Sequence, residues 1–297
     1  MPRVTRDGVS IHYDRERGDG RGEGVPVVFL QGLGLGRWQW RWQREALASA
    51  GEYDLIAPDT RGTDRSDAGL PPLVGRLPRR LRSPLLQSRL SYSVGGLAAD
   101  LEAVLEDAGV RDAHLVGLDL GGMVAQRYAL EYSRAASLTL IGTSHGGVDA
   151  MAMDEDVLSE LLASADSPRE TARERLRPLF AERFTNRNPH LLDRLIEWQL
   201  AQAPSNPALE SQLGAMTGFD VSDRLKGLRL PTLVIHGSGD RIVPVENGRL
   251  FEAKLPNVQF LELEGGSHGC FLEQADRVND VLESFLAEVS ATTTATV

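Results

Sequence analysis

A chain of 297 residues is long for one domain and short for two, so its length favours one domain with a sizeable insertion. Its composition, 41% hydrophobic and 25% charged, is that of an ordinary globular protein, and the net charge of -10 argues against non-specific binding to nucleic acid or an anionic membrane. The single cysteine, Cys270, excludes an internal disulfide, and neither a signal core nor a run of roughly 18 apolar residues is present. We therefore expect a cytoplasmic protein.

Short apolar runs recur along the chain, with helical patterns between them. The first strand is expected at Gly8–Tyr13, followed by a polar, glycine-rich turn. VPVVFL at Val25–Leu30 is apolar throughout, as in a strand that is buried on both faces of a sheet. Further strands are expected at Tyr53–Ala57, Ala113–Val116, Ser137–Gly142, Pro231–Gly237 and Val258–Leu263. This alternation predicts an α/β fold with a mostly parallel central sheet flanked by helices.

Residues 147–218 interrupt the alternation. They contain only helical patterns, such as ETARERLRPLFAERF and PHLLDRLIEWQLAQA, and the second has an apolar stripe that includes Leu191, Leu195 and Ile196. We therefore expect a core formed by residues 1–146 and 219–297, with a helical cap of residues 147–218 inserted between two strands.

Residues 68–91 form a second irregular stretch, which is rich in arginine and has no acidic residue. Its arginines are Arg76, Arg79, Arg80, Arg82 and Arg89. Such a run is usually a solvated loop or a short helix. Because it leaves a strand end beside the expected pocket, it is also a candidate lid or a candidate contact of a homodimer.

Glycine-rich or acidic motifs lie at the ends of the predicted strands. GLDLGG at residues 117–122 connects a strand to a helical pattern, and its glycines leave room for a strained backbone at the central residue, Asp119. Along the chain, the other motifs are QGLGLG, PDTRGTDRSD, HGSGDRIVP and EGGSHGCFLEQ. Ligands of parallel sheets bind beyond the carboxyl ends of the strands, so we expect these motifs to meet at one site.

In this order the motifs resemble those of the α/β-hydrolase fold, and the resemblance covers nearly the whole chain. It implies a catalytic triad of Asp119 as nucleophile, His268 in GGSHG and Asp240 in HGSGD. It also implies that QGLGLG is the oxyanion loop, with the backbone N–H groups of Leu33 and Leu120 as donors. With an aspartate in place of serine at the elbow, the chain resembles epoxide hydrolases and haloalkane dehalogenases.

An aspartate nucleophile changes the chemistry. A carboxylate is ionised near neutral pH and attacks a saturated carbon, which leaves an alkyl ester on the enzyme. His268, oriented by Asp240, would then activate the water that hydrolyses this ester, and the product would be an alcohol or a diol. Attack by Asp119 on an ester or amide would give a reactive anhydride, so ordinary esterase or peptidase activity is not expected.

The sequence departs from both enzyme groups that carry this aspartate. Dehalogenases grip halide with a Trp after the nucleophile and often an Asn in the oxyanion loop, where this chain has Leu120 and Leu33. Epoxide hydrolases commonly protonate the epoxide oxygen with two cap tyrosines, but all five tyrosines of this chain lie outside the cap. The candidate donors that would contact the substrate instead are Trp198, His190, His145 and Tyr92.

Other departures lie in the motifs. Gln31, a further candidate for substrate binding, replaces the usual His before the oxyanion glycine, and Asp64 replaces the usual Gly of the RGxGxS signature. The stretch GGMVAQRYALEYSRAASLTLIGTS resembles the serine branch of the fold, the lactonases and peptidase-like enzymes. We therefore interpret Asp119 as a replacement of serine within that branch.

These observations favour an epoxide hydrolase-like enzyme, which acts at a saturated carbon through an Asp119 ester. The alternatives are a haloalkane dehalogenase, a cyclase, lyase or isomerase with Asp119 as general base, and a ligand-binding relative without catalysis. The apolar cap and the tryptophans Trp38, Trp40 and Trp42 suggest an apolar small-molecule substrate, although such tryptophans more often pack a helix. Without metal-ligand spacing or a phosphate-binding glycine loop, we expect no metal and no cofactor.

Overall fold

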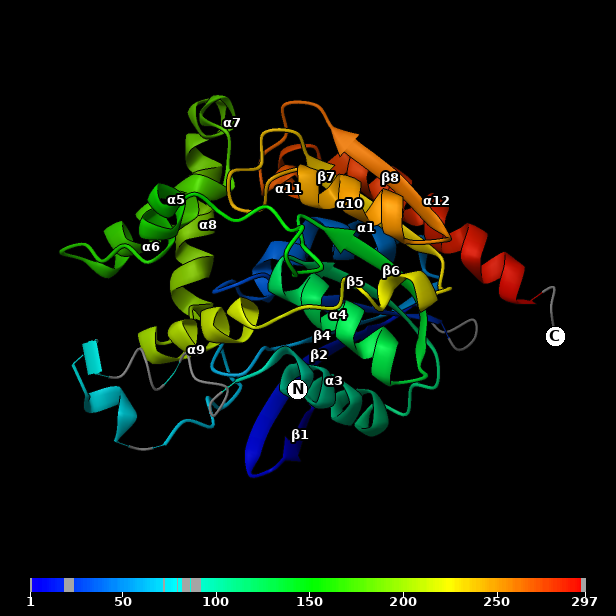
Figure 1. Ribbon diagram of the computed structural model, residues 1–297, viewed down its shortest axis with the longest axis horizontal. Coiled ribbons are helices and arrows are strands. Elements are labelled where there is room, and N and C mark those ends of the chain that lie inside the picture. Colours follow the sequence, from blue (N-terminus) through cyan, green and yellow to red (C-terminus); the bar gives the residue numbers. More distant parts are fainter. Residues whose placement is uncertain are drawn as a thin grey trace.

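A mostly parallel β-sheet forms the centre of the protein in the computed structural model, which describes residues 2–18, 24–71, 73–78, 80–81, 86 and 92–294 (Figure 1). Its strand order is β1-β2-β4-β3-β5-β6-β7-β8. β2 (Val9–Arg17) is antiparallel to β1 (Arg3–Arg6) and to β4, and the other pairs are parallel. The remaining strands are β3 (Val25–Leu30), β4 (Tyr53–Pro58), β5 (Ala113–Leu118), β6 (Ala135–Ile141), β7 (Thr232–Gly237) and β8 (Val258–Leu263). The predicted fold class is confirmed.

The N-terminal strands differ from the prediction. Instead of one strand at Gly8–Tyr13, the chain forms a hairpin of β1 and β2, and β2 continues to Arg17. Asp7 and Gly8 make the turn, with φ of +51° and +77°. β1 was missed because RVTR is a short, partly exposed edge strand without an apolar run.

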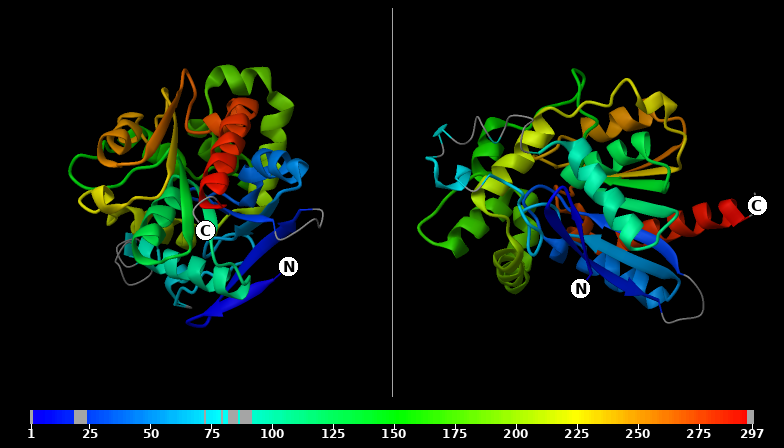
Figure 2. Two further views of the ribbon diagram at one scale, coloured as in Figure 1. Left: turned by 90° about the vertical axis from the view of Figure 1, so that its right-hand side faces the viewer. Right: turned by 90° about the horizontal axis from the view of Figure 1, so that it is seen from below.

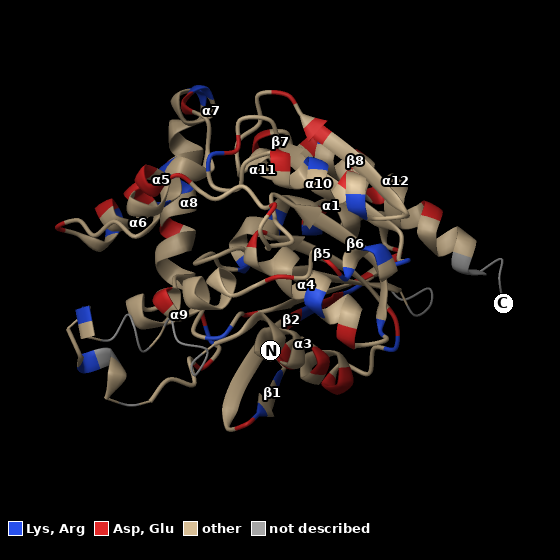
Figure 3. Ribbon diagram, viewed as in Figure 1, with Lys and Arg blue, Asp and Glu red and all other residues tan. Residues whose placement is uncertain are grey.

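Helices cover both faces of the sheet, which explains why its central strands are apolar (Figure 2). Val28 and Leu30 of β3 join one core cluster with the helices α3 (Val94–Asp107), α4 (Leu120–Glu131) and α10 (Glu246–Lys254). Val27 and Phe29 point to the other face and pack with α1 (Arg41–Ala50) and α12 (Ala275–Thr294). β3, β5, β6 and β7 contain no charged residue, whereas the surrounding helices carry both signs (Figure 3).

The tryptophans near the start of α1 pack in or against the core cluster that contains Val27 and Phe29. Trp40, in η1 (Arg37–Trp40), is fully buried, and its ring centroid lies 5.4 Å from that of Phe29 and 5.1 Å from that of Phe271. Phe271 belongs to α11 (Cys270–Glu273). These contacts assign Trp40 to packing rather than to ligand binding.

The segment expected to be a cap, residues 147–218, follows β6 in the chain and precedes β7. It contains the helices α5 (Glu155–Leu161), α6 (Pro168–Leu176), η3 (Arg177–Leu179), α7 (Glu182–Arg187), α8 (Pro189–Gln202) and α9 (Asn206–Thr217). The short helix η4 (Leu225–Gly227) follows before β7. Figure 1 shows the helices α5 to α9 together on one side of the sheet. Among the described residues, no helix is long and apolar enough to cross a membrane.

The arginine-rich stretch is described only in part. Its described residues include the short helix η2 (Val74–Arg76), and Arg76 and Arg80 are exposed. Arg79, Arg82 and Arg89 lie outside the described residues. The lid and dimer interpretations of this stretch stay predictions.

The close packing of the turn between β5 and α4 can be tested through the stability of glycine variants. A Cβ atom at Gly121 would lie 2.2 Å from the backbone oxygen of Leu30, whereas a Cβ at Gly95 in α3 would lie no closer than 3.7 Å to its neighbours. We expect Gly121→Ala to lower the free energy of unfolding by about 1–3 kcal/mol or more. Gly95→Ala, the matched control, should leave it unchanged or raise it by up to about 1 kcal/mol. Urea denaturation measures both, and equal stabilities would contradict the tight contact at Gly121.

Candidate active site

Asp119 occupies a strained turn between β5 and α4, as the GLDLGG motif predicted. Its φ and ψ are +48° and -112°, a region that non-glycine residues rarely adopt. The turn is fixed on both sides, because the Asp119 N–H donates to the Ile141 carbonyl at 3.0 Å and the Thr143 hydroxyl donates to the Asp119 carbonyl at 2.7 Å. Close approach of β3 to this turn requires glycine at residue 121.

The two oxygens of the Asp119 carboxylate differ in their surroundings. Oδ2 accepts a hydrogen bond of 3.1 Å from the Leu33 N–H. The Leu120 N–H, at the start of α4, also lowers the pKa of the carboxylate. Oδ1 is buried and has no hydrogen-bond partner among the described residues. Burial raises the pKa of Asp119, although the charge of His268 and the two N–H groups act in the opposite direction. Of the two predicted oxyanion donors, Leu33 therefore contacts the proposed nucleophile directly, and Leu120 acts on its pKa.

His268 and Asp240 form a buried pair at the ends of β8 and β7. The Nδ1 atom of His268 lies 2.8 Å from Oδ2 of Asp240, while Oδ1 of Asp240 accepts the N–H groups of Ile242 and Val243 at 2.8 and 2.9 Å. Burial favours the neutral acid, but the charge of His268 and the hydrogen bonds outweigh it and lower the pKa of Asp240 to about 2. Burial lowers the pKa of His268, and the charges of Asp240 and Asp119 outweigh this and raise it.

Two neighbours of this pair were not predicted as part of the site. His236 places Nε2 3.4 Å from Oδ2 of Asp240 and 2.8 Å from the carbonyl oxygen of Val243. Gly142 follows β6 with φ of +46°, and a Cβ there would lie 3.2 Å from both Asp240 and His268. The only signals in the sequence are the position of His236 in the HGSGD motif and a glycine directly after a strand, and neither identifies these contacts.

The loop that carries His268 also contacts the cap. The carbonyl oxygen of Leu179 accepts hydrogen bonds from the Ser267 hydroxyl and the Gly269 N–H, both at 2.6 Å. The carboxylate of Glu273 accepts the N–H groups of Ser267 at 2.9 Å and of Ala181 at 2.6 Å. The residues on each side of His268 are thus tied to the cap segment.

A small cavity lies over Asp119 and His268. Its volume is about 20 Å³, and the other residues that line it are Leu33, Leu35, Leu161, Leu179 and Ile242. A neighbouring cavity of about 40 Å³ shares the four leucines and extends beneath α5, α6, α8 and α9. The first volume has room for about one water molecule, so a substrate can enter only when these apolar side chains move.

Gln31 and Tyr92, two of the predicted substrate contacts, are placed elsewhere. The side chain of Gln31 donates to the carbonyl oxygen of Pro58 and accepts from the hydroxyl of Thr60 at 2.8 Å, so it holds the loop after β4. The hydroxyl of Tyr92 donates to the carbonyl oxygen of Ala68 at 2.6 Å. Neither residue lines the cavity at Asp119.

The other candidate donors are also placed away from this cavity. His145 places Nδ1 2.6 Å from the carbonyl oxygen of Gly146 and packs edge-on against Phe251 of α10, with ring centroids 5.4 Å apart. Trp198 packs against Trp42, with ring centroids 6.0 Å apart, and His190 is exposed. In the structure, local partners therefore direct the side chains of Gln31, Tyr92, His145 and Trp198 away from this cavity. Their assignment to substrate binding stays a prediction.

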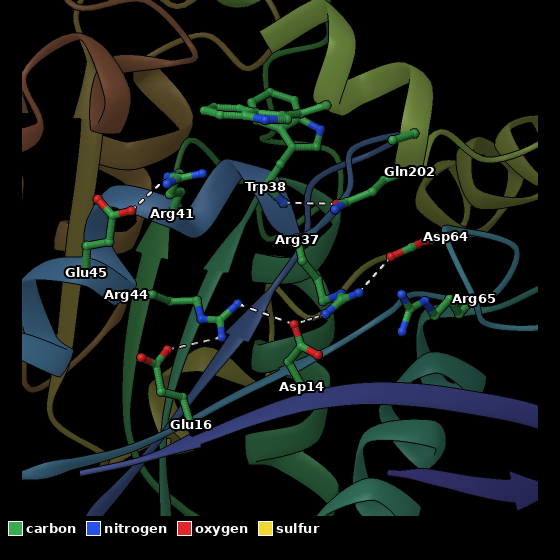
Figure 4. Close-up of a pocket in the computed structure, with 12 residues that line it drawn as sticks. Asp14, Glu16, Arg37, Trp38, Arg41, Arg44, Glu45, Asp64, Arg65 and Gln202 are labelled. Carbon is green, nitrogen blue, oxygen red and sulfur yellow. Dashed lines mark hydrogen bonds and ion pairs between the residues drawn. The ribbon is translucent and has the colours of Figure 1, made fainter. Parts of the chain in front are cut away.

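A larger groove, about 630 Å³, lies between η1, α1 and α8 and does not include the triad (Figure 4). Its charged residues neutralise one another, as in Arg37–Asp64 at 2.7 Å and Arg41–Glu45 at 2.7 Å. In the part of the chain that the structure describes, no group of three or more His, Cys, Asp or Glu side chains is placed to hold a metal ion. The groove is separate from the chemistry at Asp119.

Comparison with known proteins agrees with this geometry. The model of the family described as the alpha/beta hydrolase fold matches residues 25–275. A putative carbamate hydrolase RutD of Azorhizobium caulinodans is 27% identical over 248 residues, which cover 83% of this chain and 85% of the relative. A 2-hydroxy-6-oxo-6-phenylhexa-2,4-dienoate hydrolase of Burkholderia cepacia is 28% identical, with 80% of this chain and 78% of the relative covered. 

Solved structures show the same fold. The enol-lactonase from Burkholderia xenovorans superimposes with a TM-score of 0.78 at 21% identity, over 96% of this chain and 100% of that one. A hydrolase from Pseudomonas aeruginosa gives a TM-score of 0.76 at 25% identity, with 96% and 97% covered. The elbow, the buried His268–Asp240 pair and the match over residues 25–275 lead to one conclusion. This chain belongs to the α/β-hydrolase fold family.

Proposed function

We propose that the protein is a hydrolase in which Asp119 attacks a saturated carbon of an apolar small molecule and forms an alkyl ester. The bond from that carbon to the leaving group breaks in the same step, and in an epoxide the leaving ring oxygen takes up a proton from water. The observation that carries this proposal is the asymmetry of the carboxylate. Oδ2 is held by the Leu33 N–H at 3.1 Å, while Oδ1 is buried without a hydrogen-bond partner among the described residues. A poorly solvated oxygen of this kind is a stronger nucleophile than a carboxylate in water.

The Leu33 N–H also serves the second step. When Oδ1 carries the alkyl group, Oδ2 becomes the carbonyl oxygen of the ester and remains beside Leu33. Water attack on the Asp119 carboxyl carbon then places the developing negative charge on this oxygen, where the Leu33 N–H stabilises it. Collapse of the tetrahedral intermediate breaks the bond between the carboxyl carbon and the alkyl oxygen. That oxygen takes the proton that His268 removed from water and leaves as the alcohol, and the carboxylate of Asp119 is restored.

Formation of the ester also prepares His268 to act as a base. The negative charge of Asp119 contributes to the raised pKa of His268, and a protonated imidazole cannot accept a proton from water. Alkylation removes that charge, so the pKa of His268 falls and the neutral form gains population. Asp240 holds Nδ1 at 2.8 Å and leaves Nε2 for the water.

The names of the relatives describe hydrolases of carbamates and of a dienoate. Asp119 does not suit attack on a carbonyl carbon, because the product would be a reactive anhydride. An epoxide is favoured over an alkyl halide because Leu120 and Leu33 stand where dehalogenases bind halide. Epoxide hydrolase-like chemistry is therefore the specific form of the proposal.

One observation favours a second candidate function. Apart from Asp119 and His268, the described residues that line the cavity are aliphatic, so none donates a proton to a leaving oxygen on the side opposite Asp119. A cyclase, lyase or isomerase whose reaction begins with removal of a proton by Asp119 does not expel an oxygen there in that step. In that case Asp119, with its raised pKa, would act as a general base.

Trapping of the ester distinguishes the two functions. We expect His268→Ala to accumulate a covalent adduct on the peptide that contains Asp119 after incubation with 1,2-epoxyhexane, as measured by mass spectrometry. The adduct accumulates because the variant lacks the base for the second step. Asp119→Asn is the control and should remain unmodified. Absence of an adduct with both 1,2-epoxyhexane and 1-bromohexane would contradict nucleophilic attack and leave the general-base function.

The rate of this alkylation should depend on pH through Asp119. Only the carboxylate form attacks, and burial raises the Asp119 pKa above the ordinary 3.8, so alkylation is lost as the pH falls through that higher value. We therefore expect the rate of adduct formation in His268→Ala to rise with pH, with a midpoint above 3.8, the ordinary pKa of aspartate. The rate is measured from about pH 4 to 8 in ~1-unit steps. A rate that is already constant throughout this interval would argue against a raised pKa.

Replacing Asp119 by serine tests whether the rest of the site suits a serine nucleophile. We expect Asp119→Ser to hydrolyse p-nitrophenyl acetate on the order of 100-fold faster than the wild type, because His268 and the oxyanion donors suit a serine nucleophile. The double variant Asp119→Ser/His268→Ala should lose this gain. If the serine variant folds and stays inactive, the interpretation of Asp119 as a replacement within a serine framework is wrong.

A further inference from the structure

Two buried glutamines of the cap hold the oxyanion loop at a single residue, Gly34. Gln199 of α8 donates from Nε2 to the Gly34 carbonyl oxygen at 2.7 Å. Gln212 of α9 accepts the Gly34 N–H on Oε1 at 3.0 Å. Their exposed fractions are 6% and 1%. Both polar groups of Gly34 are therefore bound by the cap, although Gly34 belongs to the core loop after β3.

The far end of each glutamine is also bound, and this fixes the direction of both amides. Oε1 of Gln199 accepts the indole N–H of Trp38 at 2.8 Å, and an indole N–H can only donate. Nε2 of Gln212 donates to the Arg61 carbonyl oxygen at 3.0 Å, and a carbonyl oxygen can only accept. Gln199 must then present its N–H₂ to Gly34 and Gln212 must present its oxygen.

The cap holds the rest of this loop as well. Gly34 has φ of +69°, and a Cβ there would lie 2.8 Å from Leu209 of α9. Farther along, Oε1 of Gln202 in α8 accepts the backbone N–H of Trp38 at 3.1 Å, a contact visible in Figure 4. The loop therefore has little freedom to turn while α8 and α9 stay in place.

Gly34 directly follows Leu33, whose N–H contacts Asp119 at 3.1 Å. We propose that Gln199 and Gln212 are positioning residues, which direct the Leu33 N–H at the carboxylate of Asp119, so that the cap completes the oxyanion hole as well as covering it. This inference rests on the proposed function in one respect only, which is the identity of the reaction that the oxyanion hole assists. The placement of the N–H group is a property of the protein without substrate.

The test measures Asp119 directly and needs no substrate. Protein with ¹³C at the aspartate carboxyl carbons is titrated by NMR, and the Asp119 signal is assigned by its loss in Asp119→Asn. A hydrogen bond from Leu33 lowers the pKa of Asp119, so Gln199→Met and Gln212→Met, which are similar in length but cannot form these bonds, should each raise it by about half a unit or more. Hydrogen–deuterium exchange should rise in a peptide that covers residues 31–36.

Ser211→Ala is the matched control, because Ser211 is buried beside Gln212 in α9 but its hydroxyl donates to the Pro207 carbonyl oxygen of its own helix at 2.9 Å. It should leave the Asp119 titration and the exchange of residues 31–36 unchanged. Thermal unfolding of every variant confirms that it is folded.

Gln199→Glu gives a second, conservative test. An ionised glutamate would place an oxygen against the Gly34 carbonyl oxygen, whereas the protonated acid can donate to it, so exchange in residues 31–36 should approach the wild-type rate only at low pH. If both methionine variants fold and leave the Asp119 pKa and loop exchange as in the wild type, the proposal is overturned. That result would say nothing against alkylation of Asp119, which the adduct experiment tests by itself.

Discussion

The hydrogen bond between the Leu33 N–H and the carboxylate of Asp119 joins the two segments on which the site depends. A buried carboxylate is costly unless it is hydrogen-bonded or paired, and this residue has two N–H groups and the charge of His268 as compensation. The strained turn at Asp119 brings the carboxylate to the loop after β3, and Gly121 permits the close approach of β3. The proposed triad and the contacts of Gly34 with α8 and α9 are arranged around this meeting point.

Much of this arrangement could be predicted from the sequence, because it is expressed in local patterns. The apolar runs of β3, β5, β6 and β7 reflect burial on both faces, and GLDLGG reflects a backbone conformation that needs small neighbours. The order of the motifs along a parallel sheet then brings Asp119, Asp240 and His268 to one edge.

The rest of the site could not be predicted, because it depends on where individual side chains point. Gln31 and His145 lie near the ends of strands, as a ligand contact would. Their side chains instead bond backbone carbonyl oxygens, that of Pro58 at the end of β4 and that of the adjacent Gly146. Gln199 and Gln212 show the opposite case, because they contact the loop beside Asp119 although no pattern in the sequence marks them. In the sequence they are ordinary polar residues of helices, and only the packing of α8 and α9 on the core reveals that both reach Gly34.

The cap is bound to both catalytic loops, through Gly34 on one side of Asp119 and through Leu179 and Glu273 beside His268 on the other. This has a consequence for the evolution and redesign of the enzyme. A cap exchanged with that of a relative to change the substrate would also remove the supports of the oxyanion loop and of the histidine loop. We therefore expect an exchange of residues 147–218 to disturb both loops unless the glutamines and the loop contacts are kept.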